Sequence, residues 1–257
     1  MRTTMTVFLS FLFGTAGLAD EDDTADVSAR LQRAGGDEAK KYYLISSKKV
    51  DRPPAGGYGI LIVLPGGNGS ADFVPFGKRV FKYGVPSGFL VAQLVAPKWT
   101  PKQEIVWPTA KDKSDVAGMK FTTEEFVSAV LDDVATKYET DATKVMTFSW
   151  SSGGPAAYAV ALTNPKVTAS FVAMSVFKPD RLPALEKAKE KLFYLYHSED
   201  DMTCPYEMAA DAEKKLGEAG AKVKLATYEG GHGWKGDVYA DIKAGFQWIG
   251  KNQSKGK

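Results

Sequence analysis

The chain has 257 residues, of which 44% are hydrophobic, and this is enough for one large domain or two small ones with a core. Its 33 basic and 31 acidic residues leave a net charge of +2, which argues against a nucleic-acid partner. A single cysteine, Cys204, excludes an internal disulfide, and with only two histidines beside it the composition argues against a structural zinc site.

The N-terminal residues 1–19 have the features of a secretory signal peptide. Arg2 gives a basic start, an apolar run follows at residues 7–13, and small residues precede Asp20. The apolar run is shorter than the roughly 20 residues that span a bilayer, which disfavours a membrane anchor, and no later segment is apolar enough to span. We therefore expect cleavage after Ala19 and export to the periplasm or out of the cell.

Residues 20–40 are acidic, small and polar, and this composition predicts a mobile leader before the folded domain. From residue 41 on, apolar runs typical of strands alternate with amphipathic stretches typical of helices. This alternation predicts a single α/β domain over residues 41–257, with a mostly parallel sheet and helices on both faces. The expected strands are 41–46, at an edge, 58–65, 88–97, 144–150, 167–175, 191–198 and 222–228, and the expected helices are 122–139, 205–220 and 237–251.

The sequence SWSSGG, at residues 149–154, lies where an expected strand meets a run of small residues. A sharp turn from strand to helix can hold a nucleophilic serine in strained backbone geometry, with small residues two positions before and after it. Ser151 meets this requirement, because Ser149 and a glycine flank it at those positions, whereas Ser152 would put Trp150 at the crowded position. An ordinary tight turn is the alternative interpretation.

A serine nucleophile requires a base, and the base requires an acid that orients it. His232 follows the last expected strand in a glycine-rich loop, which lets its ring reach a neighbouring strand end. Acids follow the preceding expected strand at Glu199, Asp200 and Asp201. The order serine, acid, histidine is that of the α/β-hydrolases. His197, at the end of the same strand, is interpreted as a buried histidine that bonds to nearby backbone.

The first long apolar run ends in PGGN, at residues 65–68, where two glycines let backbone amides turn toward a ligand. The amide of Gly67, or that of Asn68, would form an oxyanion hole together with the amide of Ser152. A plain turn between a strand and a helix is the alternative, since such turns also favour glycine and asparagine.

Two loops of the sequence match motifs of a known family. HSEDDMTCPY matches an acid loop of the form H-G-x-x-D-x-x-x-P-Y, which selects Asp201 as the acid, and GGHGW matches a final loop of the form G-G-H-x-W. From Tyr58 to Ile249 the chain thus resembles the α/β-hydrolases of the small exported esterase type, which include dienelactone hydrolases, phospholipase/carboxylesterases, feruloyl esterases and polyhydroxybutyrate depolymerases. It departs from them at Pro65, where a histidine is usual, and at Ser149, where a glycine is usual.

The resemblance implies an α/β-hydrolase fold and a serine esterase that needs no metal or organic cofactor. The chain leaves no room for a large lid domain. Ser151 would attack the carbonyl of a small-molecule or polymer ester, His232 would take its proton, and Asp201 would orient the ring. A serine peptidase or amidase of the prolyl-oligopeptidase type shares this fold and triad order. A non-catalytic binding protein with the same fold is the other alternative.

Three tryptophans are candidates for a substrate pocket. Trp99 and Trp107 lie in the long segment 96–121 after an expected strand, and Trp234 follows His232 by two residues. Aromatic side chains suit an apolar ester pocket. They could equally pack the segment onto the body of the domain.

Overall fold

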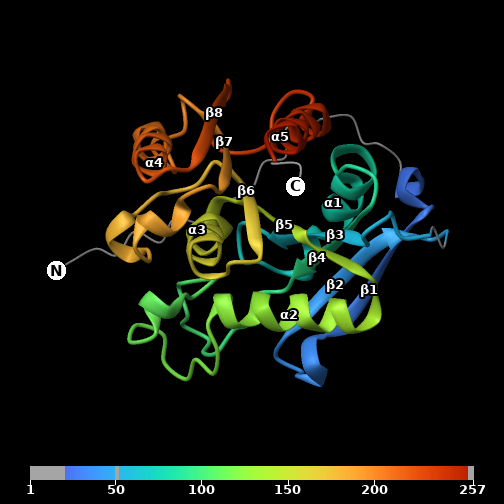
Figure 1. The fold of residues 1–257 in the computed structure, drawn as a ribbon. Coiled ribbons are helices and arrows are strands. Elements are labelled where there is room, and N and C mark those ends of the chain that lie inside the picture. Colours follow the sequence, from blue (N-terminus) through green and yellow to red (C-terminus); the bar gives the residue numbers. More distant parts are fainter. Residues whose placement is uncertain (1–20, 50–51, 254–257) are drawn as a thin grey trace.

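The computed structural model describes residues 21–49 and 52–253, so the expected signal peptide lies outside the described residues. These residues form an eight-stranded sheet with helices on both faces (Figure 1), and none of their helices is both long and apolar enough to cross a membrane. The strands are β1 (Val27–Arg33), β2 (Lys41–Ser47), β3 (Tyr58–Leu64), β4 (Phe89–Leu94), β5 (Thr140–Trp150), β6 (Val167–Ala173), β7 (Leu192–Ser198) and β8 (Lys222–Tyr228). The helices are α1 (Val74–Arg79), α2 (Thr123–Lys137), α3 (Gly154–Thr163), α4 (Tyr206–Glu218) and α5 (Val238–Asn252), and the short 3-10 or π turns are η1 (Glu21–Thr24), η2 (Ala34–Gly36), η3 (Ala71–Phe73), η4 (Val80–Gly84), η5 (Ala110–Asp112), η6 (Ser151–Gly153), η7 (Pro179–Arg181) and η8 (Leu185–Ala188).

The strand order is β1-β2-β4-β3-β5-β6-β7-β8. β2 pairs antiparallel with both of its neighbours, and the remaining pairs are parallel. The chain passes from β3 to β4 on one side and then crosses to β5 on the other side, so the order reverses at β3. Ligands bind beyond the carboxyl ends of strands at such a reversal, which points to the loops after β3 and β5. The predicted mostly parallel sheet with helices on both faces is confirmed.

Alternate residues of the central strands pack into two cores, one on each face of the sheet. Ile60 and Ile62 of β3 belong to the core that α2, α3 and α4 cover. Leu61 and Val63 belong to the other core, which includes Phe246 of α5. Strands that are covered on both faces are apolar along their whole length, and this is why the sequence predicts them as continuous apolar runs.

α2 begins with the capping box that the sequence indicates. Thr122 Oγ1 accepts a hydrogen bond from the backbone N–H of Glu125 at 3.2 Å, and Glu125 Oε2 accepts one from the backbone N–H of Thr122 at 2.8 Å. Two backbone donors that the first helical turn leaves unpaired are thereby satisfied. The face of α2 that packs on the sheet is apolar and consists of Phe126, Val127, Val130, Leu131 and Val134.

At the start of the chain the structure differs from the expectation of a mobile leader at 20–40 and an edge strand at 41–46. β1 lies within the expected leader and pairs antiparallel with β2 over seven residues. β1 is therefore the edge strand, and β2 lies between β1 and β4. The physical reason is a weak alternation: Val27 is buried and Ala29 packs against the core, while Ser28 and Arg30 are polar.

Tyr42 of β2 connects the β1–β2 side of the sheet to α2 through a hydrogen bond to Asp133. Its side chain is fully buried, and its hydroxyl donates a hydrogen bond to Asp133 Oδ2 at 2.5 Å. Burial, followed by the hydrogen bond to Asp133, raises the pKa of Tyr42, so that the hydroxyl keeps its proton. Asp133 Oδ1 also accepts from the backbone N–H of Gly35, in the turn between β1 and β2.

We therefore expect Tyr42→Phe to lower the free energy of unfolding by about 2 kcal/mol, because a buried hydrogen bond to a charged group contributes roughly this much. Tyr43→Phe, at the next position of the strand, is the matched control, since the Tyr43 hydroxyl has no hydrogen-bond partner among the described residues. Urea denaturation of the two variants checks the prediction. Equal free energies of unfolding would contradict it.

Candidate active site

Ser151 lies at the turn between β5 and α3, in left-handed backbone geometry with a φ of 51°. The turn is closed against the end of β3: a Cβ atom at Gly153 would lie 2.1 Å from the carbonyl oxygen of Leu64. Ser149 is fully buried, and its Oγ has no hydrogen-bond partner in the described part of the chain. A larger side chain at either flanking position would push the turn away from the sheet, and the small residues of the motif reflect this constraint.

Ser151, His232 and Asp201 come together at the carboxyl ends of β5, β8 and β7. His232 Nε2 lies 3.0 Å from Ser151 Oγ, and His232 Nδ1 lies 2.7 Å from Asp201 Oδ2. Because a carboxylate accepts hydrogen bonds, Nδ1 carries the proton in this arrangement and Nε2 is left to accept the proton of the Ser151 hydroxyl. The three side chains therefore form a continuous relay from hydroxyl to carboxylate.

The Asp201 carboxylate is the buried end of this relay, with no exposed side-chain surface. Its Oδ1 accepts hydrogen bonds from the backbone N–H groups of Thr203 and Cys204, both at 2.8 Å. These donors replace the water that a buried carboxylate loses. Glu199 and Asp200, the other candidate acids, are exposed on the same loop, and Asp201 is the one of the three that contacts His232.

The loop after β8 is held so that His232 reaches back across the end of β7. The backbone N–H of Gly231 donates to Ser198 Oγ at 3.1 Å, and the carbonyl oxygen of Gly231 accepts from the Tyr228 hydroxyl at 2.9 Å. Gly231 has a φ of 77°, a conformation that glycine adopts at little cost. The glycine-rich sequence thus lets the loop turn the imidazole toward the serine.

The loop after β3 contacts the residue that follows Ser151. Gly67 has a φ of 58°, and its carbonyl oxygen accepts a hydrogen bond from Ser152 Oγ at 2.8 Å. Asn68 Oδ1 accepts from the backbone N–H of Ser70 and so stabilises its own loop. The structure therefore brings Gly67 next to Ser152, as an oxyanion hole built from these two backbones requires.

The three tryptophans pack against different parts of the domain. Trp107 is only 2% exposed, and its Nε1 donates to the carbonyl oxygen of Pro65 at 2.8 Å. Trp99 packs edge-on against Phe121 with the ring centroids 4.7 Å apart, and Trp234 stacks on a tyrosine of β7 with the centroids 5.9 Å apart. The structure favours the packing interpretation. It also adds a role that sequence reasoning missed, since Trp107 supports the loop after β3.

His197 is buried and bonds to nearby backbone, because its Nε2 lies 2.7 Å from the carbonyl oxygen of Cys204. Sequence reasoning missed its second neighbour. The same Nε2 lies 3.4 Å from Asp201 Oδ2, so both histidines of the chain contact one carboxylate. The acid-loop motif of the family contains His197 and Asp201, but their contact forms only because the loop after β7 curls back toward the strand.

In the described ranges, one group of three side chains could hold a metal ion, and it consists of Asp201, Cys204 and His232. Their donor atoms all lie within 4.8 Å of one another. The carboxylate and the imidazole are already hydrogen-bonded to each other. Burial, followed by the Asp201 charge, raises the pKa of the Cys204 thiol to about 12, whereas a metal binds the thiolate. The donor chemistry therefore fits a proton relay better than a metal centre.

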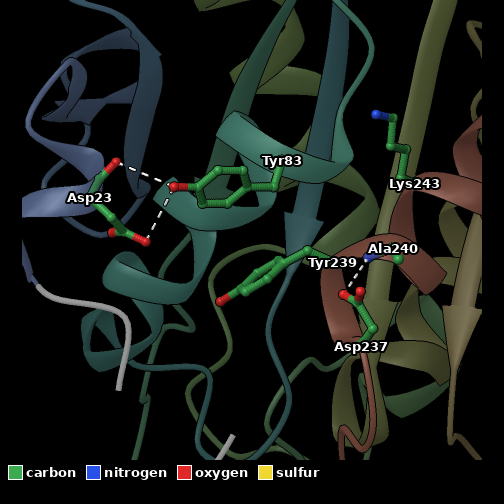
Figure 2. Close-up of a pocket in the computed structure, with 6 residues that line it drawn as sticks. All are labelled: Asp23, Tyr83, Asp237, Tyr239, Ala240 and Lys243. Carbon is green, nitrogen blue, oxygen red and sulfur yellow. Dashed lines mark hydrogen bonds between the residues drawn. The ribbon is translucent and has the colours of Figure 1, made fainter. Parts of the chain in front are cut away.

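Two surface cavities of the described residues are lined by none of the three relay residues. One, of about 410 Å³, lies between η4 and the start of α5 (Figure 2). In it the Tyr83 hydroxyl donates to Asp23 and the Asp237 carboxylate accepts from the backbone N–H of Ala240, so these polar groups are paired within the protein. The other, of about 750 Å³, lies at the amino ends of β3 and β4, at the edge of the sheet opposite the relay.

Comparison with known proteins identifies the family of the chain. A model of the dienelactone hydrolase family matches residues 90–244, so the chain belongs to that family, within the α/β-hydrolase superfamily. A comparison with curated proteins finds no match. The resemblance inferred from the sequence is thereby confirmed at the level of the family.

Solved structures of several hydrolases share the fold. A Klebsiella pneumoniae protein described as a dienelactone hydrolase is 16% identical with a TM-score of 0.61, and the match covers 90% of this chain and 99% of that protein. A Bacillus cereus carboxylesterase is 15% identical with a TM-score of 0.59, over 90% and 97% of the two chains. Esterase 2 of Thermogutta terrifontis, solved after phosphonylation by sarin, is 14% identical with a TM-score of 0.62, over 84% and 92%.

The state of Cys204 gives a prediction for its reactivity. At about pH 8, a thiol with a pKa of about 12 contains roughly three orders of magnitude less thiolate than the unfolded chain, whose thiol pKa is about 8.5. We therefore expect iodoacetamide to leave Cys204 unmodified in the native protein and to alkylate it fully in urea, as measured by mass spectrometry. Alkylation of the native protein at the unfolded rate would contradict the buried, protonated thiol.

Proposed function

We propose that this protein is an exported serine hydrolase that cleaves carboxylic esters through an acyl-enzyme on Ser151. The observation that carries the proposal is the relay of 3.0 Å and 2.7 Å contacts from Ser151 through His232 to Asp201. A hydroxyl on a strained turn, an imidazole with its acceptor nitrogen toward that hydroxyl, and a buried carboxylate behind the ring are the parts that acyl transfer needs.

In the proposed first step, Ser151 Oγ forms a bond to the ester carbonyl carbon while its proton moves to His232 Nε2. Asp201 holds the ring and stabilises the imidazolium that forms. The carbonyl oxygen becomes an oxyanion, which the backbone N–H groups of Gly67 and Ser152 would stabilise, with that of Asn68 as the alternative to Gly67. The imidazolium then gives its proton to the leaving alcohol as the bond to that alcohol breaks.

In the second step, water attacks the acyl-enzyme carbonyl and gives a proton to His232 Nε2. The tetrahedral intermediate collapses, the proton returns to Ser151 Oγ, and the carboxylic acid is released. Every proton in the cycle is thus carried by groups that the relay already joins, and this chain's own residues perform each transfer.

Family membership and the esterases among the structural neighbours support an ester substrate of small-molecule or polymer type. Export is proposed on the sequence of residues 1–19 alone, with its basic start, apolar run and small residues before Asp20. A protein extract of periplasm and culture medium, probed for the chain lacking residues 1–19, tests this part of the proposal. Retention of the full-length chain in the cytoplasm would contradict it.

Removal of the proposed nucleophile tests the reaction. Ser151→Ala should lower kcat for a p-nitrophenyl ester by about four orders of magnitude or more and should abolish labelling by an organophosphonate, without loss of fold. Ser149→Ala is the matched control, because the Ser149 hydroxyl has no partner among the described residues and alanine is equally small. Labelling that persists in Ser151→Ala and disappears in Ser149→Ala would move the nucleophile to Ser149.

The acid is tested separately from the nucleophile. Asp201→Asn should lower kcat by about four orders of magnitude, because an amide neither stabilises the imidazolium nor holds the same ring tautomer. Asp200→Asn should stay near the wild-type rate, since that carboxylate is exposed beside the relay. Steady-state kinetics with ester and anilide substrates check both variants. Loss of activity in Asp200→Asn alone would refute the assignment of Asp201 as the acid. Faster cleavage of the anilide than of the ester would favour an amidase.

A further inference from the structure

His197 contacts the acid of the proposed triad. Its ring is buried at the end of β7, and its Nε2 lies 2.7 Å from the carbonyl oxygen of Cys204 and 3.4 Å from Asp201 Oδ2. A carbonyl oxygen only accepts, so Nε2 carries the hydrogen and points it toward Cys204. The same N–H lies beside the carboxylate oxygen that bonds to His232 Nδ1.

These contacts close a ring around the carboxylate. The backbone N–H of Cys204 donates to Asp201 Oδ1 at 2.8 Å, while the carbonyl oxygen of Cys204 accepts from His197. Cys204 is thus held from both sides of its backbone, once by the carboxylate and once by the imidazole. The carboxylate is therefore linked to His197 through the backbone of Cys204.

Apolar packing contributes little to the intervening part of this loop. The Met202 side chain is 93% exposed, and Thr203 is exposed as well. Polar contacts therefore have to hold the loop in its curled form. Three of them start from the end of β7, whose last residues pair with β8. Ser198 accepts hydrogen bonds from the backbone N–H groups of Asp200 and Asp201 through its Oγ and its carbonyl oxygen. The contact from His197 is the one of these three that reaches as far along the loop as Cys204.

We propose that His197 is a positioning residue for the acid: its Nε2–H holds the Cys204 carbonyl, and through this loop it keeps the Asp201 carboxylate aimed at His232. The inference rests on the proposed function, because positioning has a kinetic consequence only if Asp201 acts in the relay. A histidine that merely filled space would be replaceable by any side chain of similar volume. A positioning histidine is replaceable only by a side chain with an N–H at the place of Nε2.

Two amide variants separate these possibilities. In His197→Gln the amide nitrogen is as many bonds from Cβ as Nε2 is in histidine, so it can reach the Cys204 carbonyl. In His197→Asn the amide nitrogen is one bond nearer to the backbone and cannot reach it. His197→Leu fills part of the volume and has no donor. Phe193→Leu, a buried substitution on the same strand and the same face, controls for a general loss of stability.

The experiment measures kcat and KM for a p-nitrophenyl ester, the rate of phosphonylation of Ser151, and the midpoint of thermal unfolding for all four variants. We expect His197→Leu and His197→Asn to lower kcat by about 100-fold with KM within about threefold, because small misplacements of a reacting group have effects of this size. His197→Gln should recover kcat to within about fivefold of wild type. Phe193→Leu should lower the unfolding midpoint and leave kcat unchanged.

The inference is overturned if Leu, Asn and Gln at position 197 give the same kcat, or if kcat follows the unfolding midpoint in every variant, including Phe193→Leu. If His197→Leu does not fold, the comparison of Gln with Asn decides alone. A wild-type protein with no ester turnover refutes the proposed function instead, and the phosphonylation rates then still compare the variants. A wild type that neither turns over esters nor is phosphonylated refutes both.

Discussion

The buried charge of Asp201 is the constraint on which the site depends. A carboxylate with no exposed surface must be surrounded by donors, and here they come from the loop after β7 and from the loop after β8. The same contacts that compensate the charge therefore fix both loops relative to the sheet. Both loops converge on the carboxylate. The relay is in this sense a consequence of satisfying one buried group.

A second constraint acts at the other end of the relay. The turn after β5 lies so close to β3 that Gly153 has no room for a side chain beside the Leu64 carbonyl, and Ser151, two residues earlier, has left-handed backbone geometry. This geometry places the hydroxyl at the carboxyl edge of the sheet, next to the point where the strand order reverses. The hydrogen bond from Ser152 to Gly67 and that from Trp107 to Pro65 then hold the loop after β3 against the turn.

Most of the sheet could be predicted from the sequence, because the parallel strands are covered on both faces and are apolar throughout. The order of Ser151, Asp201 and His232 followed from loops that come after such strands. The sequence did not predict β1, because Val27 is the one buried residue of the strand and Leu31 is 40% exposed. The hydrogen bond by which Trp107 supports the loop after β3 could not be predicted, because its partner, Pro65, is 42 residues away in the chain. Such contacts depend on tertiary packing, which local patterns do not encode.

The central claim is that Ser151 carries the acyl group of an ester during turnover. The most direct measurement is peptide mass spectrometry of protein quenched in acid while it hydrolyses p-nitrophenyl acetate. We predict an acetyl group on the peptide that contains Ser151, formed as p-nitrophenol is released and absent from Ser151→Ala. An acetyl group on Cys204, or full turnover by Ser151→Ala, would contradict the account.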